Sequence, residues 1–221
     1  MAPRPYRMGA RQAAADETRA RIVAAARTML GAPEGLGAFT VDAVAREAGV
    51  ARMTIYYQFG SKRGLIEAVF DSLAIVRRGV ARLVDALALA DPEATLAEFV
   101  GTFADVWEED RLVVRRLHAL AVLDPEFSAV WHAREGRRRE GMREIARRVA
   151  ARRRPSALDV DAATAALYAL VSPEGFEAMA GPERTYADVA PIMHDLARRA
   201  LGLDAGVPVG PGAAARSRGR R

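Results

Sequence analysis

The sequence of 221 residues contains no cysteine, and only one of its 33 basic residues, Lys62, is a lysine. Without cysteine there are no disulfides and no thiolate metal ligands, and a reducing cytoplasm is the expected location. No apolar run reaches the ~20 residues that span a bilayer. The basic N-terminal stretch also lacks the apolar segment of a signal peptide. We therefore expect a soluble, cytoplasmic protein with no membrane partner.

The usual signatures of catalysis and metal binding are also missing. His118, His132 and His194 are far apart in the sequence, and none has a metal-ligand spacing. There is no glycine-rich phosphate loop and no Gly-x-Ser-x-Gly motif. We therefore expect no metal, no cofactor and no enzymatic activity.

The charge that is present is unevenly distributed. Residues 1–63 have ten basic and five acidic residues, residues 64–204 have a net charge of −4, and residues 205–221 have four arginines and no acid. Such asymmetry is typical of a chain with one end that faces nucleic acid. Arginine runs at 137–139, 147–148 and 152–154 alternate with Glu135, Glu140 and Glu144 at helical distances, which favours a solvated helix face.

Apolar periodicity predicts helices and no sheet. A helix is expected to start near Asp16, and residues 1–15 are expected to form a flexible basic arm. Turn-forming residues at Asp91-Pro92, Asp124-Pro125, Arg154-Pro155-Ser156, Ser172-Pro173 and Gly181-Pro182 separate the later helices. The expected organisation is a helix-turn-helix domain over 16–77, a second helical domain over 78–203 and a disordered basic tail over 204–221.

Residues 40–59 carry a helix-turn-helix pattern. Thr40 is a good N-cap, Gly49 permits the sharp turn, and a second short helix follows from Arg52. This second helix offers polar and aromatic side chains for DNA, although its tyrosines could equally belong to a helical core. Ser61 and Lys62 at the start of the next helix form an expected anion site.

These motifs resemble the TetR family of transcriptional regulators in order and spacing, from Phe39-Thr-Val-Asp-Ala-Val-Ala to Thr54-Ile-Tyr-Tyr-Gln-Phe and Ser61-Lys62-Arg-Gly-Leu65. The resemblance implies an all-α fold with an N-terminal three-helix helix-turn-helix domain and a helical-bundle domain for ligand binding and dimerisation. Ala51 and Met53 depart from the family pattern, in which position 51 usually caps the recognition helix. The DNA-binding residues expected from the motif are Thr40, Arg52, Met53, Thr54, Tyr56, Tyr57, Ser61 and Lys62.

The second domain offers a candidate ligand pocket and a candidate dimer interface. An aromatic stripe suits a pocket for an apolar or aromatic small molecule, although simple core packing explains it as well. The pocket residues expected are Phe99, Phe103, Trp107, His118, Phe127 and Trp131. The interface residues expected on the last two helices are Val160, Ala163, Leu167, Leu170, Val189, Ile192, Met193 and Leu196. Pro191 is expected to kink the final helix or to move its start to about Ala190.

The sequence therefore predicts a one-component bacterial transcriptional regulator, a homodimeric repressor that a small ligand releases from a near-palindromic operator on double-stranded DNA. One alternative is a regulator of the same fold that responds to a protein partner or to no small molecule. Another is a helical interaction or enzyme domain with an incidental helix-turn-helix.

Overall fold

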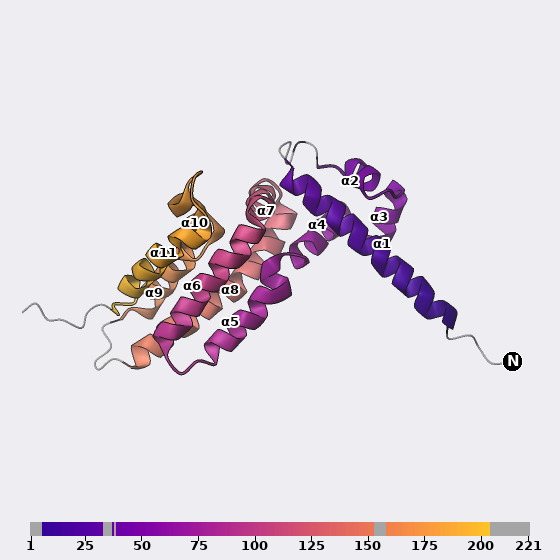
Figure 1. The fold of residues 1–221 in the computed structure, drawn as a ribbon. Helices are drawn as coiled ribbons and strands as arrows, with labels where there is room; N and C mark the ends of the chain where they lie inside the picture. Colours follow the sequence, from indigo (N-terminus) through magenta and orange to yellow (C-terminus); the bar gives the residue numbers. More distant parts are fainter. Residues whose placement is uncertain (1–5, 33–36, 38, 153–157, 204–221) are drawn as a thin grey trace, which may run out of the picture.

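The computed structural model describes residues 6–32, 37, 39–152 and 158–203, and this part of the chain is helical and contains no strand. Helices α1 to α4 form one group, and the remaining helices pack side by side in a second (Figure 1). The all-α prediction is confirmed. The first group comprises α1 Tyr6–Gly31, α2 Val41–Glu47, α3 Arg52–Phe59 and α4 Lys62–Asp71.

Helix α1 begins at Tyr6, well before the start near Asp16 that the sequence predicted. The flexible arm expected over 1–15 is therefore wrong for residues 6–15, while residues 1–5 and the tail 204–221 lie outside the described residues. Alanine has the highest helix propensity, and three consecutive alanines at 13–15 extend the helix towards its N-terminus. Gln12 supports it by donating to Asp16 at 2.9 Å. As a result, α1 projects beyond the rest of its group (Figure 1).

The first group packs around α1. Ile22 and Leu30 of α1, Val44 of α2, Ile55 of α3 and Leu65 of α4 are all fully buried. Burial of this kind supplies most of the free energy that holds short helices together. The turn between α2 and α3 contains Gly49 at φ 65°, a backbone conformation that glycine adopts without strain.

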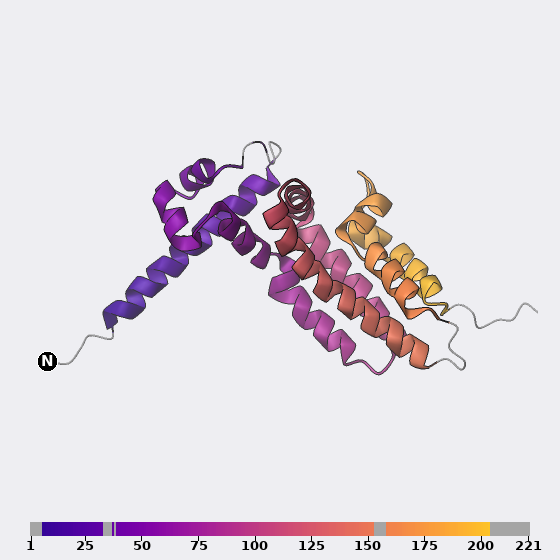
Figure 2. The ribbon, with the colours of Figure 1, turned by 180° about the vertical axis from the view of Figure 1, so that it is seen from behind.

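The second group, seen from behind in Figure 2, begins after α4 and ends with α11. Its first element is a π-helical turn, Ile75–Gly79. Its other helices are α5 Val80–Leu87, α6 Pro92–Glu109, α7 Arg111–Leu123, α8 Pro125–Ala151, α9 Val160–Leu170, α10 Pro173–Ala180 and α11 Tyr186–Ala200. Helices α6, α8 and α10 each begin at a proline, where its missing N–H costs no hydrogen bond. These three starts confirm three of the predicted breaks, and the end of α10 at Ala180 confirms a fourth at Gly181-Pro182. The break at 154–156 lies outside the described residues.

Helix α11 continues through Pro191, so the predicted later start near Ala190 is wrong. The helix instead begins at Tyr186, after a capping box in which Thr185 and Asp188 satisfy each other's backbone N–H groups. Proline removes only the one hydrogen bond that Ala187 would have accepted. Burial of Val189 and Met193 on either side of Pro191 holds the helix against α6.

Candidate DNA interface and ligand cavity

Helix α3 presents large side chains to solvent rather than to the core. Tyr57 is 88% exposed and Met53 is 72% exposed, whereas Ile55 between them is fully buried. Tyr56 and Thr54 are half-buried. An aromatic ring this exposed contributes nothing to the core, so the reading of Tyr57 as a core residue is excluded. The exposed face is available to a partner such as DNA.

The N-termini of α2, α3 and α4 lie close together. Arg52, the first residue of α3, donates to Asp42 in the first turn of α2 at 3.0 Å. Lys62, the first residue of α4, lies with its Nζ 5.9 Å from the ring centre of Phe39, just before α2. The first N–H groups of each helix have no intrahelical acceptor, and the helix dipole adds positive potential there. The N-termini of α2, α3 and α4, together with the charge of Lys62, therefore form a surface that favours phosphate binding.

The caps of these helices agree with the sequence. Thr40 Oγ1 accepts from Ala43 N–H at 3.1 Å, and Ser61 Oγ accepts from Gly64 N–H at 3.0 Å. Each hydroxyl acts as an acceptor in its cap, which leaves the O–H to donate to a phosphate oxygen. Ala51 provides no side-chain cap for α3, as its chemistry requires.

Asp42 was missed by the sequence analysis. Its carboxylate holds Arg52, which also donates to the hydroxyl of Tyr56 at 3.3 Å. The hydrogen bond with Tyr56 and the charge of Asp42 raise the pKa of Arg52 above its ordinary value. An acid in the first turn of a helix is usually explained by the helix dipole. Nothing in the sequence reveals that this acid also orients an arginine on the neighbouring helix.

Helix α1 fixes the far end of α3. Arg19 donates to the backbone carbonyl of Gln58 at 2.7 Å, and its guanidinium lies 4.3 Å from the ring centre of Phe59. Helix α1 also packs against α7, so it contacts both groups of helices.

The link between the two groups is centred on a buried carboxylate. Asp110, at the junction of α6 and α7, is 1% exposed and accepts from Arg27 of α1 at 2.5 Å. Its second oxygen accepts from the backbone N–H of Ala74 at 2.6 Å, at the start of the π-helical turn. Burial raises the pKa of Asp110, and the Ala74 hydrogen bond and the Arg27 charge oppose this rise. This joint, like Asp42, was not predicted from the sequence.

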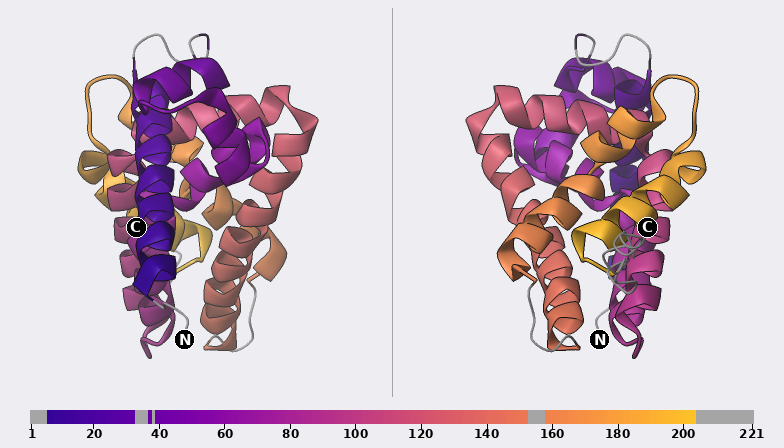
Figure 3. Two further views of the ribbon diagram at one scale, coloured as in Figure 1. Left: turned by 90° about the vertical axis from the view of Figure 1, so that its right-hand side faces the viewer. Right: turned by 90° about the vertical axis from the view of Figure 1, so that its left-hand side faces the viewer.

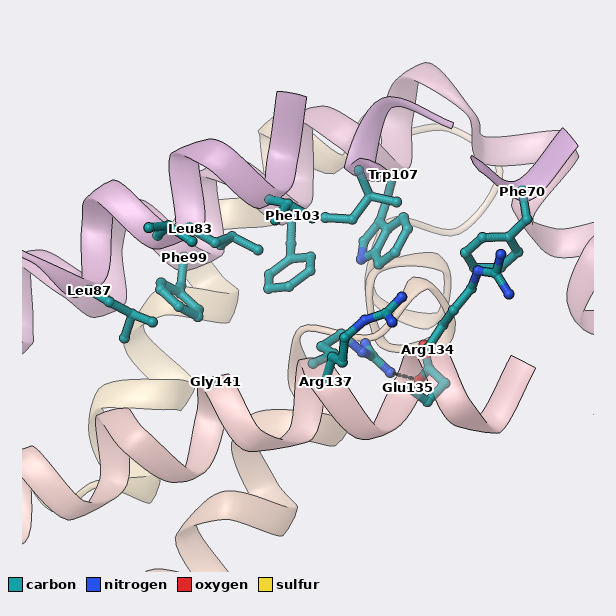
Figure 4. A pocket seen from close by; sticks show the side chains of 14 residues that line it. Phe70, Leu83, Leu87, Phe99, Phe103, Trp107, Arg134, Glu135, Arg137 and Gly141 are labelled. Atoms are coloured by element: carbon teal, nitrogen blue, oxygen red, sulfur yellow. Dashed lines mark hydrogen bonds and ion pairs between the residues drawn. The ribbon is translucent and has the colours of Figure 1, made fainter. Parts of the chain in front are cut away.

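A cavity of about 220 Å³ lies between α5, α6 and α8 (Figure 4). Phe99, Phe103 and Trp107 project into it from α6, with successive ring centres 6.3 Å and 5.6 Å apart. Leu83 and Leu87 of α5 form a second apolar wall. The indole N–H of Trp107 donates to the carbonyl of Val171 at 3.1 Å, so its polar atom is satisfied and its apolar ring surface faces the cavity.

The end of the cavity next to the first group of helices is polar. It is lined from α8 by four charged side chains, Arg134, Glu135, Arg137 and Arg138. Phe70, near the end of α4, also lines it and makes an edge-to-face contact with Trp131 at 5.5 Å. The cavity therefore borders directly on the helix that carries Lys62.

The six expected pocket residues fall in different places. Phe99, Phe103 and Trp107 line the cavity described above, whereas His118 and Trp131 stack on each other at 5.0 Å and line a separate, more polar hollow. Phe127 is buried in the core and lines neither. The expectation that all six residues line one pocket is thus wrong for His118, Phe127 and Trp131. Apolar periodicity predicts which face of a helix a residue lies on, but not which neighbouring helix that face packs against.

The eight expected interface residues also divide. Ala163, Leu167, Val189 and Met193 are buried within the chain, where α9 packs on α8 and α11 packs on α6, so assigning them to the interface is wrong. Val160 and Leu170 are half-buried. Only Ile192 and Leu196 are exposed, at 41% and 37%, one turn apart on α11. The amphipathic pattern could not distinguish an internal partner helix from a second chain.

The described residues contain neither a membrane-spanning helix nor a cluster of metal ligands. No helix in the described ranges is long and apolar enough to cross a membrane. The same ranges contain no group of three or more histidine or acidic side chains that could hold a metal ion.

A helix-turn-helix with an exposed second helix, mounted on a helical body, is the arrangement expected of a DNA-binding regulator. Residues 22–69 match the family described as "Bacterial regulatory proteins, tetR family". A comparison with curated proteins found no match. The family match over residues 22–69 and the fold of the described residues together support a TetR family transcriptional regulator.

Solved structures of similar fold belong to the same class. The regulator PfmR from Thermus thermophilus is 27% identical, with 81% of this chain and 97% of that chain covered at a TM-score of 0.61. A TetR regulator from Haloarcula marismortui is 18% identical, with 86% and 98% covered at a TM-score of 0.67. NalD from Pseudomonas aeruginosa, the secondary repressor of the MexAB-OprM multidrug efflux pump, is 19% identical, with 84% and 96% covered at a TM-score of 0.59.

Proposed function

We propose that this regulator is a homodimeric repressor that binds a near-palindromic operator and leaves it when a small molecule enters the cavity between α5, α6 and α8. The observation that carries the proposal is the position of Phe70, which lines the cavity from α4, the helix that follows the helix-turn-helix. A ligand that prefers a shifted position of Phe70 would move α4 and α3 and so change the fit to DNA. The alternative is a regulator of the same fold that responds to a protein partner or to no small molecule, and a pocket too small or too polar for a ligand would favour it.

The proposed DNA surface combines α3 with the starts of α2 and α4. Lys62, Thr40, Ser61 and Tyr56 are assigned to phosphates, whereas Thr54 and Tyr57 approach base edges. The remaining assignments are Arg52, for a guanine edge or a phosphate, and Met53, for a thymine methyl. The proposed DNA-binding domain is 16–77, preceded by the N-terminal part of α1, and the proposed sensing and dimerising domain is 78–203.

The proposed dimer interface is the exposed face of α9 and α11 (Figure 3). Ile192 and Leu196 of α11 are its large apolar residues, and the exposed alanines 162, 165 and 169 of α9 permit close helix approach. The two helices contact each other within the chain, so one face presents both. A two-fold dimer would place two copies of α3 in successive major grooves, about 34–36 Å apart.

Selection of genomic DNA fragments by the purified protein tests the proposal. We expect enrichment of an inverted repeat whose half-sites lie one helical turn apart, and a smaller yield of that repeat with Tyr57→Ala. Val122→Glu, a change at an exposed residue of α7, serves as the control and leaves selection unchanged. Recovery of fragments without a shared sequence would refute operator binding. Genes beside the selected sites would then show whether removal of the protein raises their expression, as a repressor requires.

A further inference from the structure

The cavity between α5, α6 and α8 has an apolar end and a positively charged end. We infer that its ligand is an amphipathic monoanion, a carboxylate with an alkyl or aryl body, and that Arg137 binds the carboxylate. This inference rests on the proposed function, because it names the chemical class of the effector. The observation behind it is the charge balance of the four charged residues that α8 places along the cavity.

Three of those four charges are already neutralised within the protein. Arg134 pairs with Asp71 at 2.5 Å and lies over the ring of Phe70 at 4.5 Å. Arg138 pairs with Glu135, and the same carboxylate accepts from the hydroxyl of Tyr168 at 2.5 Å. Arg138 and Glu135 are only 6% and 13% exposed, so this pair is screened little by solvent. Neither carboxylate is therefore free for a further cation.

Arg137 is different. It lines the cavity, and within the described part of the chain its guanidinium makes no hydrogen bond or ion pair. It is exposed, which places it at the mouth, where a charged head group keeps contact with water (Figure 4). A guanidinium offers two parallel N–H donors that match the two oxygens of a carboxylate. The one uncompensated positive charge of Arg137 fits one negative charge and disfavours a cationic ligand.

The other end of the cavity accepts the apolar body. Phe99, Leu83 and Leu87 line it. Arg148 of α8 donates to the carbonyl of Leu87 at 3.0 Å and so links α8 to the end of α5. A Cβ atom at Gly141 would lie 3.3 Å from the ring of Phe99, so glycine keeps space open at this point. Gly141 follows Arg137 by about one helical turn, or ~6 Å along α8. The head group and the body of one small ligand therefore reach both ends.

Calorimetric titration of the full chain tests the inference with four probes: octanoate, decanoate, octanamide and octylamine. We expect the two carboxylates to bind more tightly than the amide, and the amine to bind weakest. Arg137→Gln should weaken carboxylate binding by roughly tenfold to a hundredfold, the usual range for a lost hydrogen bond to a charged group, and leave the amide unchanged. Arg137→Lys should retain part of the affinity.

Two further variants distinguish the cavity from the rest of the surface. Gly141→Leu fills the apolar end and should reduce binding of both the carboxylates and the amide. Arg147→Gln removes the same charge from α8 at a position paired with Glu140 at 3.1 Å and should change neither. Equal carboxylate affinity in wild type and Arg137→Gln would overturn the inference. Equal affinity for octanoate and octanamide, or no binding of any carboxylate, would overturn it as well.

Release of the selected DNA by the same probes separates this inference from the proposed function. If the carboxylates bind as expected but do not release DNA, the ligand class stands and ligand-controlled release is wrong. If only uncharged apolar compounds release DNA, release stands and the role of Arg137 is wrong.

Discussion

Lys62 and Tyr57 are proposed to contact DNA in two different ways. Lys62 stands at the start of α4, where its charge adds to a helix dipole and to the neighbouring starts of α2 and α3. Tyr57 stands on the solvent face of α3 and is almost fully exposed. A cation at a helix start suits any phosphate, whereas a side chain in a groove reads base edges.

Replacement of Lys62 by alanine is expected to weaken binding to specific and random DNA by similar factors. One phosphate contact is lost, so the slope of log affinity against log salt should fall by about one. Fluorescence anisotropy over a range of salt concentrations measures both quantities. An effect confined to the specific sequence would contradict the phosphate role.

Replacement of Tyr57 by alanine is expected to act on sequence preference. Affinity for the selected operator should fall by about 1–3 kcal/mol while affinity for random DNA stays nearly constant. Competition with operators changed at single base pairs locates the base that Tyr57 contacts. Equal losses on specific and random DNA would place Tyr57 on the backbone instead.

For single residues, the sequence predicted the helix caps and the exposed motif residues, but it did not predict which side chains pair with each other. Thr40 and Ser61 were predictable because a cap needs only local geometry. The Arg52–Asp42 pair was not, because it depends on the angle between two helices. Phe127 and Leu167 were misplaced for a similar reason: an apolar residue at a helical spacing is buried somewhere, and only the tertiary fold says against what.

At the scale of the helices, the two groups are held together where α1 meets the π-helical turn and the α6–α7 junction. This connection depends on Asp110, which is buried and accepts from both Arg27 and Ala74. Ile75, the residue after Ala74, lines the proposed ligand cavity. We propose that a change in this cavity reaches α1 through the contacts that share the Asp110 carboxylate.

Asp110→Asn is expected to lower the free energy of unfolding by about 1–3 kcal/mol, because asparagine keeps an acceptor for Ala74 but loses the charge opposite Arg27. A double-mutant cycle with Arg27→Gln should give a coupling free energy of at least ~0.5 kcal/mol. Asp105→Asn, which breaks an exposed pair with Arg82, is the matched control and should cost less than about 1 kcal/mol. Additive effects of the Arg27 and Asp110 changes would contradict a direct interaction.

Glu177 of α10 links α7 and α11, because it accepts hydrogen bonds from Arg111 of α7 and Tyr186 of α11. Hydrogen bonds from Arg111 and then Tyr186 hold the pKa of Glu177 below its ordinary value of 4.5. A lowered pKa in the folded state means that ionised Glu177 stabilises the fold above about pH 4.5 and that this contribution is lost as the pH falls through the folded value.

Glu177→Gln should therefore lower the melting temperature at pH 7 by roughly 2–4 °C, which corresponds to about 1 kcal/mol, and the difference from wild type should shrink in acid. Thermal unfolding followed by circular dichroism between pH 3 and pH 7 measures this. Glu98→Gln, at an exposed glutamate of α6, controls for loss of charge alone. A difference that grows in acid would contradict the assigned direction of the pKa shift.

Helix boundaries in the second group were largely predictable because prolines mark the starts of α6, α8 and α10. The early start of α1 was not, because an alanine-rich segment carries no hydrophobic period even when it is helical. The predicted helix start near Ala190 was wrong because it rested on Pro191 alone. A local rule predicted a boundary, and packing of the residues around the proline kept the helix continuous.

In the whole molecule as proposed, a dimer, the two copies of the DNA-binding domain bind the two half-sites of one palindromic operator. Ile192→Glu should place a charge in the apolar face of α11 and shift the protein towards monomers in analytical ultracentrifugation. Operator affinity should fall with it, because a monomer contacts one half-site. Val122→Glu adds the same charge on α7 and should leave the dimer intact. An Ile192→Glu dimer of wild-type stability would place the interface elsewhere.

The central claim is that this chain recognises a DNA sequence through α3 and the helix starts around it. The most direct test compares the dissociation constant of the wild type for its selected operator with that for a scrambled duplex at physiological salt. We predict that the dissociation constant for the operator is at least ~10³-fold lower than that for the scrambled duplex, within the range usual for specific regulators. Equal dissociation constants for the two duplexes would contradict it.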